Sequence, residues 1–228
     1  MRTIGVVTTA RSDYGCLLPV LRAIERDPEL RLHLIVGGMH LSPEFGRTVE
    51  QIERDGFPIA DRVELLLSSD TALGTAKSIG LGVMGFAESY ARVRPDVLVA
   101  FGDRFEMHAA VLAALPFGMP IAHIHGGEVT EGAIDDALRH GITKMAHLHF
   151  TSTQEYAARV VRMGEEPWRV TVSGAPSLDN LATVELLDRA ALEARFDVSF
   201  DPARTRVREV IVNPHSALVN QCRVTPPG

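Results

Sequence analysis

Charged and imidazole side chains follow two of the most apolar runs of this sequence. Asp103 and Arg104 follow Val97–Phe101 after one glycine, while His125 and Glu128 lie in the loop after the next apolar run. Burial and neighbouring charges move the pKa values of carboxyl and imidazole groups toward neutrality, which suits groups that abstract and return a proton. The residue types therefore indicate acid–base chemistry. A structural ion pair between Asp103 and Arg104 is the alternative.

Two histidines and two glycines occupy the second of these segments. His123 and His125 are two residues apart on an expected strand, so both side chains should point to one face. Such a pair could bind a metal, but neutral core histidines that donate to the backbone are common. Gly126 and Gly127 let another backbone or a ligand approach closely. We predict no metal at this segment.

A pair of carboxylates opens the next helical pattern. Asp135 and Asp136 precede Arg139 on this pattern, so at least one carboxylate is expected to be an N-cap. The other is then available for chemistry. Because Glu128 lies in the same long loop, we expect several carboxylates and histidines to converge on one cleft.

Two turns have the residue types of phosphate sites. Arg11 follows the first apolar run, with Tyr14 in the same turn, and its guanidinium could bind phosphate oxygens beside the amides of the following helix. A surface cation next to an ordinary N-cap at Ser12 or Asp13 is the alternative. Gly174–Ser177 separates a strand pattern from a helix pattern. It is either a second phosphate-accepting turn or an ordinary turn.

A Gly-x-Gly-x-x-Gly match at Gly80–Gly85 does not predict a dinucleotide site. It follows the helical stretch Thr71–Ile79 rather than a strand, so it cannot open a helix beneath a pyrophosphate. We expect instead a helix whose glycines allow close packing on a neighbour.

The elements that must position these residues alternate between short β-branched runs and longer helical patterns. The continuously apolar run Val97–Phe101 is typical of a parallel sheet covered by helices on both faces. We predict an α/β fold with a doubly wound, mostly parallel Rossmann-like sheet, which binds ligands beyond the carboxyl ends of its strands. The expected strands are Thr3–Thr8, Leu32–Val36, Arg62–Leu67, Val97–Phe101, Ile121–Ile124, Leu148–Thr151 and Val170–Ser173, and the first helix is expected over Gly15–Arg26.

The composition argues against several classes of protein. The 228 residues carry a net charge of −6 without a lysine- or arginine-rich run, which argues against a nucleic-acid partner. Cys16 and Cys222 form no Cys-x-x-Cys pair, which favours a reducing cytoplasm over a disulfide scaffold. A secretory h-region and a run of about 20 apolar residues are both missing. We therefore predict a cytoplasmic protein without a membrane partner.

The regular pattern weakens toward the end of the sequence. A charged helical pattern over Leu187–Phe196 and a short apolar run over Val210–Val212 are followed by residues without either period. We predict a Rossmann-like domain over residues 1–179. Residues 180–228 are expected to be a linker and the incomplete start of a second domain.

Taken together, the polar segments resemble the hydrolysing UDP-N-acetylglucosamine 2-epimerases that feed sialic acid and other nonulosonic acid synthesis. The matching segments run in order through the first part of the chain, which makes the resemblance specific. They are Arg11–Tyr14, Phe101–Glu106, His123–Val129, Ile134–Asp136, Arg139–His149 and Gly174–Asp179.

The resemblance implies a fold similar to the GT-B glycosyltransferases, with a UDP-sugar between two Rossmann-like domains and this chain as the N-terminal half. It implies that UDP is eliminated across C1 and C2 of the sugar and that water adds to the resulting glycal. The products would be an N-acetylmannosamine-type sugar and UDP, formed without a cofactor. The full-length protein would be a homo-oligomer.

The residues and the resemblance together give a set of candidate site residues. Several relatives have a glutamate where this chain has His125, and the second-domain His-Pro motif of the family is echoed only by Pro214 and His215, in reversed order. Catalytic candidates are Asp103, His125, Glu128, Asp135 and His215. Substrate-binding candidates are Arg11, Tyr14, Arg104, His123, Gly126, Gly127, Asp136, Arg139 and Ser177.

Two other functions remain open at this point. A metal-dependent phosphoesterase could use Asp103 and the histidines, although the sequence lacks an Asp-x-His after its first strand. A non-catalytic protein that binds a nucleotide sugar or pairs with another subunit is the second alternative.

Overall fold

The computed structural model describes residues 1–131, 134–182 and 187–197. The chain divides into two compact units, Met1–Val184 and Glu185–Gly228. The first unit contains the sheet. In the second unit the described residues form helix α7 (Arg189–Phe196), where the carboxylate of Asp188 accepts a hydrogen bond from the backbone nitrogen of Ala191 at 2.8 Å.

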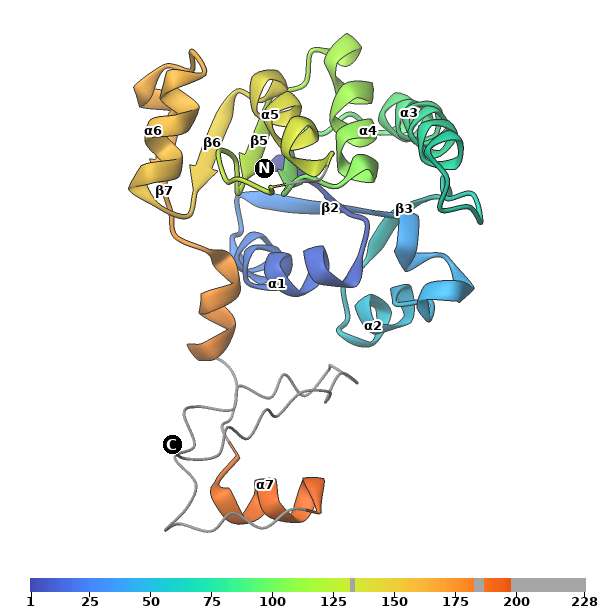
Figure 1. Cartoon of the computed structure of the whole chain (residues 1–228), viewed down its shortest axis with the longest axis vertical. Helices are drawn as coiled ribbons and strands as arrows, with labels where there is room; N and C mark the ends of the chain where they lie inside the picture. Colours follow the sequence, from blue (N-terminus) through green and yellow to red (C-terminus); the bar gives the residue numbers. More distant parts are fainter. Residues whose placement is uncertain (132–133, 183–186, 198–228) are drawn as a thin grey trace. The chain divides into compact units, whose positions relative to one another are not determined.

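Seven parallel strands form the sheet of the first unit, in the order β3-β2-β1-β4-β5-β6-β7 (Figure 1). The chain winds outward from β1 to β3, returns to the centre at β4 and then winds the other way. The predicted doubly wound parallel sheet is confirmed. Its strands are β1 (Arg2–Thr8), β2 (Leu30–Gly37), β3 (Ile59–Val63), β4 (Val97–Phe101), β5 (Ile121–Ile124), β6 (Leu148–Thr151) and β7 (Val170–Val172).

Strand β3 is the least accurately predicted of these. The sequence indicated Arg62–Leu67, but the paired residues are Ile59–Val63, with a register shift in β2 between Leu34 and Ile35. The apolar residues after Val63 belong to the core without belonging to the sheet, since Leu65 is only 3% exposed. An apolar run therefore misplaced the strand because burial alone does not require pairing.

Helices cover both faces of the sheet (Figure 1). One core packs the strand residues Val6, Leu34 and Val99 against α1 and α2, and the other packs Val7 and Ile35 against α3, α4 and α5. Neighbouring strand residues point to opposite faces, which is why both cores draw on the same strands. The helices are α1 (Arg11–Arg26), α2 (Val49–Arg54), α3 (Ala72–Arg92), α4 (Phe105–Ala114), α5 (Asp135–Met145) and α6 (Gln154–Arg162), with short 3-10 helices η1 (Gly38–His40), η2 (Pro43–Phe45), η3 (Leu115–Phe117), η4 (Pro167–Arg169) and η5 (Pro176–Ala182).

The glycines of Gly80–Gly85 lie inside α3. A Cβ added to Gly82 would come within 2.9 Å of the Cβ of Ala109, and one added to Gly85 within 2.7 Å of Val63. These glycines let the helix pack closely on α4 and β3. The expected helix with closely packed glycines is confirmed.

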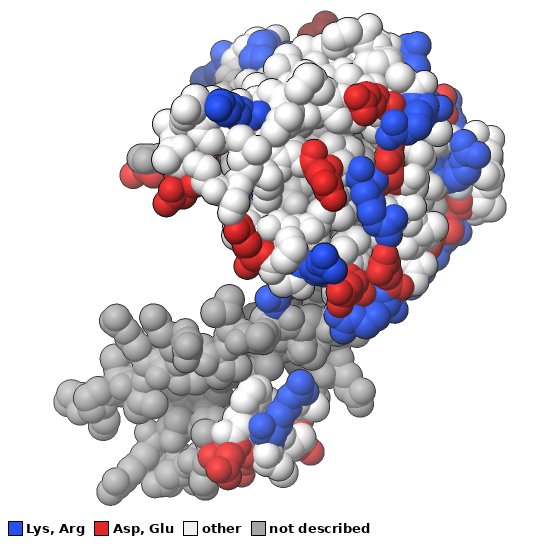
Figure 2. Space-filling view, turned by 90° about the vertical axis from the view of Figure 1, so that its right-hand side faces the viewer, with Lys and Arg blue, Asp and Glu red and all other residues white. Residues whose placement is uncertain are grey.

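Charges of both signs are mixed on the face that carries β3, α2 and α3 (Figure 2). Arg62 lies 2.6 Å from Glu53 on this face, and Arg92 pairs with Asp61. The surface seen in Figure 2 therefore has no large patch of positive charge.

Among the described helices, none combines the length and the apolar character needed to cross a membrane.

Candidate active site

Asp103 lies just beyond the end of β4, and its carboxylate pairs with Arg139 of α5. Oδ2 of Asp103 accepts hydrogen bonds from Nη2 of Arg139 and from Oγ1 of Thr130, the latter at 3.2 Å. The two charged side chains are 20% and 8% exposed, so the pair is largely withdrawn from water. An ion pair between Asp103 and Arg104 does not form.

Arg139 connects the loops that follow β4 and β5. Its Nη1 donates to the backbone oxygen of His125 at 2.9 Å and lies 3.6 Å from Oε2 of Glu128. Its Nη2 also donates to Oγ1 of Thr130 at 3.1 Å. One guanidinium with five N–H donors thus fixes the relative positions of two loops that carry predicted catalytic residues.

His125, Glu128 and Ser152 form a hydrogen-bonded group at the ends of β5 and β6. Nδ1 of His125 lies 2.6 Å from Oε1 of Glu128, and Oγ of Ser152 donates to the same oxygen at 2.6 Å. Burial opposes ionisation of Glu128, but hydrogen bonds from His125 and Ser152 and the charge of Arg139 lower its pKa below the ordinary value. The carboxylate is therefore ionised at neutral pH.

The backbone turns sharply at His125. Strand β5 ends at Ile124, and His125 has a φ of 65°, in the left-handed region that costs a residue with a Cβ about 1–2 kcal/mol. Its nitrogen donates to the backbone oxygen of Phe150 at 2.9 Å. The prediction that His123 and His125 alternate on one strand is therefore wrong, because the chain leaves the strand between them.

His123 is a core residue. It is fully buried, with Nε2 at 2.8 Å from the backbone oxygen of Gly102 and Nδ1 at 3.2 Å from Oγ1 of Thr143. Burial lowers its pKa to about 3, so the ring is neutral at physiological pH. The ring therefore has no exposed surface in this structure, and the predicted substrate contact stays a prediction. Through its hydrogen bond to Gly102, His123 holds the backbone of the residue that precedes Asp103.

Gly126 and Gly127 are buried beneath side chains and backbone of neighbouring elements. A Cβ on Gly127, where φ is 79°, would lie 2.5 Å from the backbone oxygen of Tyr156 in α6. A Cβ on Gly126 would lie 3.0 Å from Nδ1 of His123. The close backbone approach is confirmed. The predicted substrate contact is not supported, because neither residue reaches the surface.

Arg104 lies at the same edge of the sheet beside two buried carboxylates. Its Nη2 donates to Oε1 of Glu106 at 2.9 Å and contacts Sδ of Met39 at 3.2 Å. Glu106 is fully buried and Asp13 is 3% exposed, and burial raises the pKa of both carboxyls against the effect of the Arg104 charge. Because the Arg104 side chain is 27% exposed, its charge is available at the surface.

Helix α1 begins at Arg11 rather than at the predicted Gly15. The N-cap is Ala10, and the carboxylate of Asp13 accepts from its backbone nitrogen at 3.2 Å. Neither alternative N-cap, Ser12 or Asp13, is therefore correct. Arg11 is exposed in the first helical turn, where the helix dipole favours anions.

Tyr14 belongs to the core between α1 and α2. Its ring is 5% exposed and makes edge contacts with His40 and Phe57. Its hydroxyl donates to Oδ2 of Asp55 at 2.6 Å. These interactions engage both the ring and the hydroxyl, and the predicted substrate contact of Tyr14 stays a prediction.

Asp135 and Asp136 open α5 as predicted, but neither is the N-cap. That position is occupied by Ile134, without a side-chain hydrogen bond. Oδ1 of Asp136 accepts from the backbone nitrogen of Thr130 at 3.2 Å, while the charge of Asp135 acts on Arg104. The two carboxylates therefore serve different neighbours.

Two candidates remain, Ser177 and His215. Ser177 belongs to η5, beside α1, where it hydrogen-bonds to Cys16. His215 lies outside the described residues. Across residues 1–131, 134–182 and 187–197, no three His, Cys, Asp or Glu side chains are grouped to hold a metal ion.

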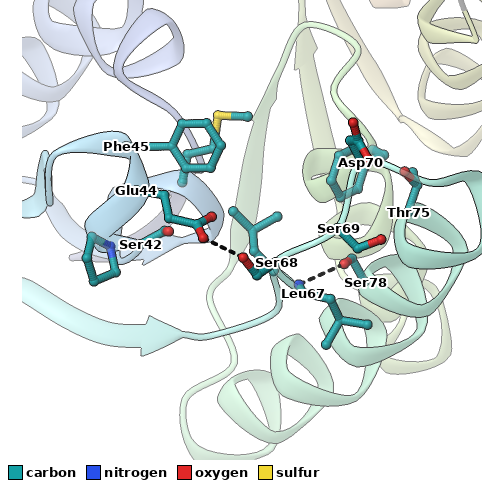
Figure 3. A pocket seen from close by; sticks show the side chains of 13 residues that line it. Ser42, Glu44, Phe45, Leu67, Ser68, Ser69, Asp70, Thr75 and Ser78 are labelled. Carbon is teal, nitrogen blue, oxygen red and sulfur yellow. Dashed lines mark hydrogen bonds between the residues drawn. The ribbon is translucent and has the colours of Figure 1, made fainter.

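A pocket of about 860 Å³ lies between the residues that follow β2 and those that follow β3 (Figure 3). Met39, which contacts Arg104, and Phe105 both line it, and Glu44 accepts a hydrogen bond from Ser68 within it. Its lining combines apolar and hydroxyl side chains with two carboxylates and contains no Lys or Arg. It suits a neutral group better than a phosphate. The lining residues are Met39, Ser42, Pro43, Glu44, Phe45, Leu66, Leu67, Ser68, Ser69, Asp70, Thr75, Ser78 and Phe105.

Sequence reasoning gave no role to several residues of this site. Ser152 lies in one of the loops after the predicted strands, where function is expected, but its hydrogen bond to Glu128 depends on the folded path of both loops. Glu106 follows Arg104 by two residues, but only burial shows that it holds the guanidinium. Thr130 gave no signal, since its role depends on the folded path of the loop.

A family described as UDP-N-acetylglucosamine 2-epimerase matches residues 22–217. The chain belongs to this family. It is 36% identical to the GDP/UDP-N,N'-diacetylbacillosamine 2-epimerase (hydrolyzing) of Campylobacter jejuni, covering 88% of this chain and 52% of that protein. It is 37% identical to the UDP-N,N'-diacetylbacillosamine 2-epimerase (hydrolyzing) of Legionella pneumophila, covering 89% and 53%. The chain thus spans about half the length of these curated relatives.

Solved structures of the family share the fold. The UDP-GlcNAc 2-epimerase of Neisseria meningitidis bound to UDP-GlcNAc superimposes with a TM-score of 0.70 at 17% identity, covering 80% of this chain and 49% of that one. The seven-stranded sheet is therefore the Rossmann-like N-terminal half of the GT-B-like architecture of these epimerases.

Proposed function

We propose that this chain carries the sugar- and proton-handling half of a hydrolysing UDP-N-acetylglucosamine-type 2-epimerase. The observation that carries the proposal is the group of Asp103, Arg139, Glu128 and His125 at the carboxyl edge of the sheet, beside the reversal of strand order. Ligands of doubly wound sheets bind at this point. Family membership supplies the reaction class. The activity is proposed for a protein that joins this segment to a second, uridine-binding domain.

The proposed reaction has two steps. A base removes the proton at C2, its C–H electron pair becomes the C1=C2 double bond, and the C1–O bond breaks with its electrons leaving on UDP. Water then adds at C1 and a proton returns to C2 on the opposite face, which gives an N-acetylmannosamine-type sugar. Asp103 and His125 are the proton-handling candidates. Arg104 and Arg11 supply positive charge for the diphosphate.

The pocket beside Arg104 supports a more specific substrate. Its aromatic, thioether and hydroxyl lining without cations fits the methyl and amide groups of an acylamino substituent. The two relatives named for diacetylbacillosamine point to the same chemistry. We therefore propose a UDP-2-acetamido sugar that carries a second acylamino group at C4. Comparison of kcat/KM for UDP-N-acetylglucosamine and its 2,4-diacetamido analogue tests this.

The reaction itself is tested with the Asp103→Asn variant of the two-domain protein. Loss of an acid–base group lowers turnover by about 10²–10⁴-fold, so UDP release should fall by that amount while the circular dichroism spectrum stays unchanged. Asp27→Asn is the matched control, because Asp27 is exposed at the end of α1, at the opposite edge of the sheet. Wild-type turnover in Asp103→Asn would remove Asp103 from the mechanism.

A further inference from the structure

The ring of His125 is held in a way that the fold alone does not explain. Its Nε2 atom is buried and, within the described residues, has no hydrogen-bond partner. The same residue has a left-handed backbone conformation without being glycine. Both features cost free energy, and buried unpaired atoms and strained residues concentrate where they serve a ligand. His125 therefore needs a functional account at the level of its two ring nitrogens.

The surroundings of Glu128 determine which nitrogen carries the hydrogen. Oε1 of Glu128 accepts from Oγ of Ser152 at 2.6 Å, and Nη1 of Arg139 lies 3.6 Å from Oε2. A carboxylate surrounded by donors is ionised and has no hydrogen to give. At 2.6 Å from Oε1, Nδ1 of His125 must therefore be the donor. A neutral imidazole has one N–H, which leaves a lone pair on Nε2.

We propose that Glu128 and Ser152 are positioning residues that hold His125 in its Nδ1–H tautomer, so that Nε2 is the base of the site. Only the identity of the proton rests on the proposed function. Nε2 takes the proton from C2 while the C–H electron pair stays with the sugar, and the ring becomes an imidazolium. The proton that Nε2 gained leaves again to solvent or product, so the pair of His125 and Glu128 ends each turnover unchanged.

The neighbouring charges favour this assignment. Arg139 and Asp103 form an ion pair, so their charges largely cancel. His123 is buried and neutral, and Arg159 of α6 pairs with the carboxylate of Glu155 at 3.4 Å. The negative charge of Glu128 therefore lies next to the ring without a second full positive charge to balance it. An imidazolium that forms at His125 is stabilised by direct contact with that charge.

Glu128 itself is poorly arranged to take the proton. Its Oε1 already contacts both Nδ1 of His125 and Oγ of Ser152, and its Oε2 faces Arg139. A group whose ionised form is stabilised this well is a weak base. Between these two residues, Nε2 of His125 is the atom without a hydrogen-bond partner, and the His125 ring lies 4.9 Å from the ring of Phe101 between centroids.

The tautomer can be measured directly on the 228-residue chain without substrate. Long-range ¹H–¹⁵N correlation spectra of ¹⁵N-histidine protein distinguish Nδ1–H from Nε2–H rings, and His125→Gln assigns the signal. We expect the Nδ1–H form for His125 in the wild type at neutral pH. In Glu128→Gln this preference should be lost, because the amide no longer requires a donor at Nδ1. Glu165→Gln is the matched control, since Glu165 pairs with another histidine, His149, at 3.2 Å.

The outcomes separate the proposal from the function on which it builds. An Nε2–H ring in the wild type, or an unchanged Nδ1–H ring in folded Glu128→Gln, would overturn it. If Glu128→Gln does not fold, Glu128→Asp withdraws the carboxylate by one methylene and should give the same loss of preference. An Nδ1–H ring that depends on Glu128 supports the positioning of His125 by Glu128 even if the full-length protein acts on a different sugar.

Discussion

Replacing Arg139 by methionine tests whether the loops of the site depend on one buried cation. The change removes the only charge that separates the carboxylates of Asp103 and Glu128 among the described contacts, and these are 20% and 22% exposed. Removing one partner of a buried ion pair costs about 3–5 kcal/mol. Because both carboxylates retain some contact with water, we expect a loss of about 2–4 kcal/mol in the free energy of unfolding.

Urea unfolding of the 228-residue chain, followed by circular dichroism, measures this loss. With a slope of about 2 kcal/mol per molar urea, a loss of 3 kcal/mol moves the midpoint down by about 1.5 M. Arg62→Met is the matched control, because Arg62 pairs with Glu53 at 2.6 Å but both side chains are about half exposed. Exposed pairs contribute about 0–1 kcal/mol, so its midpoint should move by less than about 0.5 M.

A double-mutant cycle identifies the pair responsible. Asp103→Asn combined with Arg139→Met should cost less than the sum of the two single changes, because the second change no longer leaves an unpaired charge. The reasoning is refuted if Arg139→Met shifts the midpoint no further than Arg62→Met does. It is also refuted if the Asp103 and Arg139 effects simply add.

Three further results are expected. Burial lowers the pKa of His40 to about 4, so below about pH 6.5 the unfolded chain binds a proton that the folded chain excludes. The free energy of unfolding of the wild type should therefore fall by about 2 kcal/mol between pH 7 and pH 5 because of this group. Urea titrations at the two pH values should show a smaller fall for His40→Gln. Gly127→Ala should destabilise the protein by more than about 2 kcal/mol, because the added Cβ meets the backbone oxygen of Tyr156. Gly80→Ala in α3 adds a Cβ that meets nothing and should stabilise the protein by up to about 1 kcal/mol. Equal thermal midpoints for the two variants would contradict this. The 228-residue chain alone should release little UDP from UDP-N-acetylglucosamine, and turnover at ordinary enzymatic rates of about 1–10³ per second would contradict the need for a second domain.

The fold was predictable because its signals are local. Apolar β-branched runs such as Val97–Phe101 are long enough to identify strands, and their alternation with helices fixes a parallel sheet. The first turn of α1 was missed because Ala10 is a poor N-cap by type, and the cap depends on Asp13 folding back. The position of β3 was missed because Leu65 is buried without being paired.

The candidate site was predictable in its membership but less so in its pairing. Position after a strand placed Asp103, Arg104 and His125 at one edge, since parallel strands end together. The sequence did not show that Asp103 would pair with Arg139, which lies 36 positions away, or that Arg104 would donate a hydrogen bond to the buried carboxylate of Glu106. Partners of this kind depend on loop paths that no local pattern encodes.

The division of labour among the carboxylates follows from those partners. Glu106 and Asp13 are buried behind Arg104, where burial raises their pKa values, whereas Glu128 is kept ionised by His125, Ser152 and Arg139. A rise in the pKa of the carboxyls behind Arg104 limits the negative charge there, so the guanidinium keeps its attraction for an anionic ligand. An ionised Glu128, by contrast, lies 2.6 Å from Nδ1 of His125 and accepts its hydrogen bond. The same residue type thus has opposite pKa shifts on the two sides of Asp103, which agrees with the proposed anion binding on one side and the proposed proton transfer on the other.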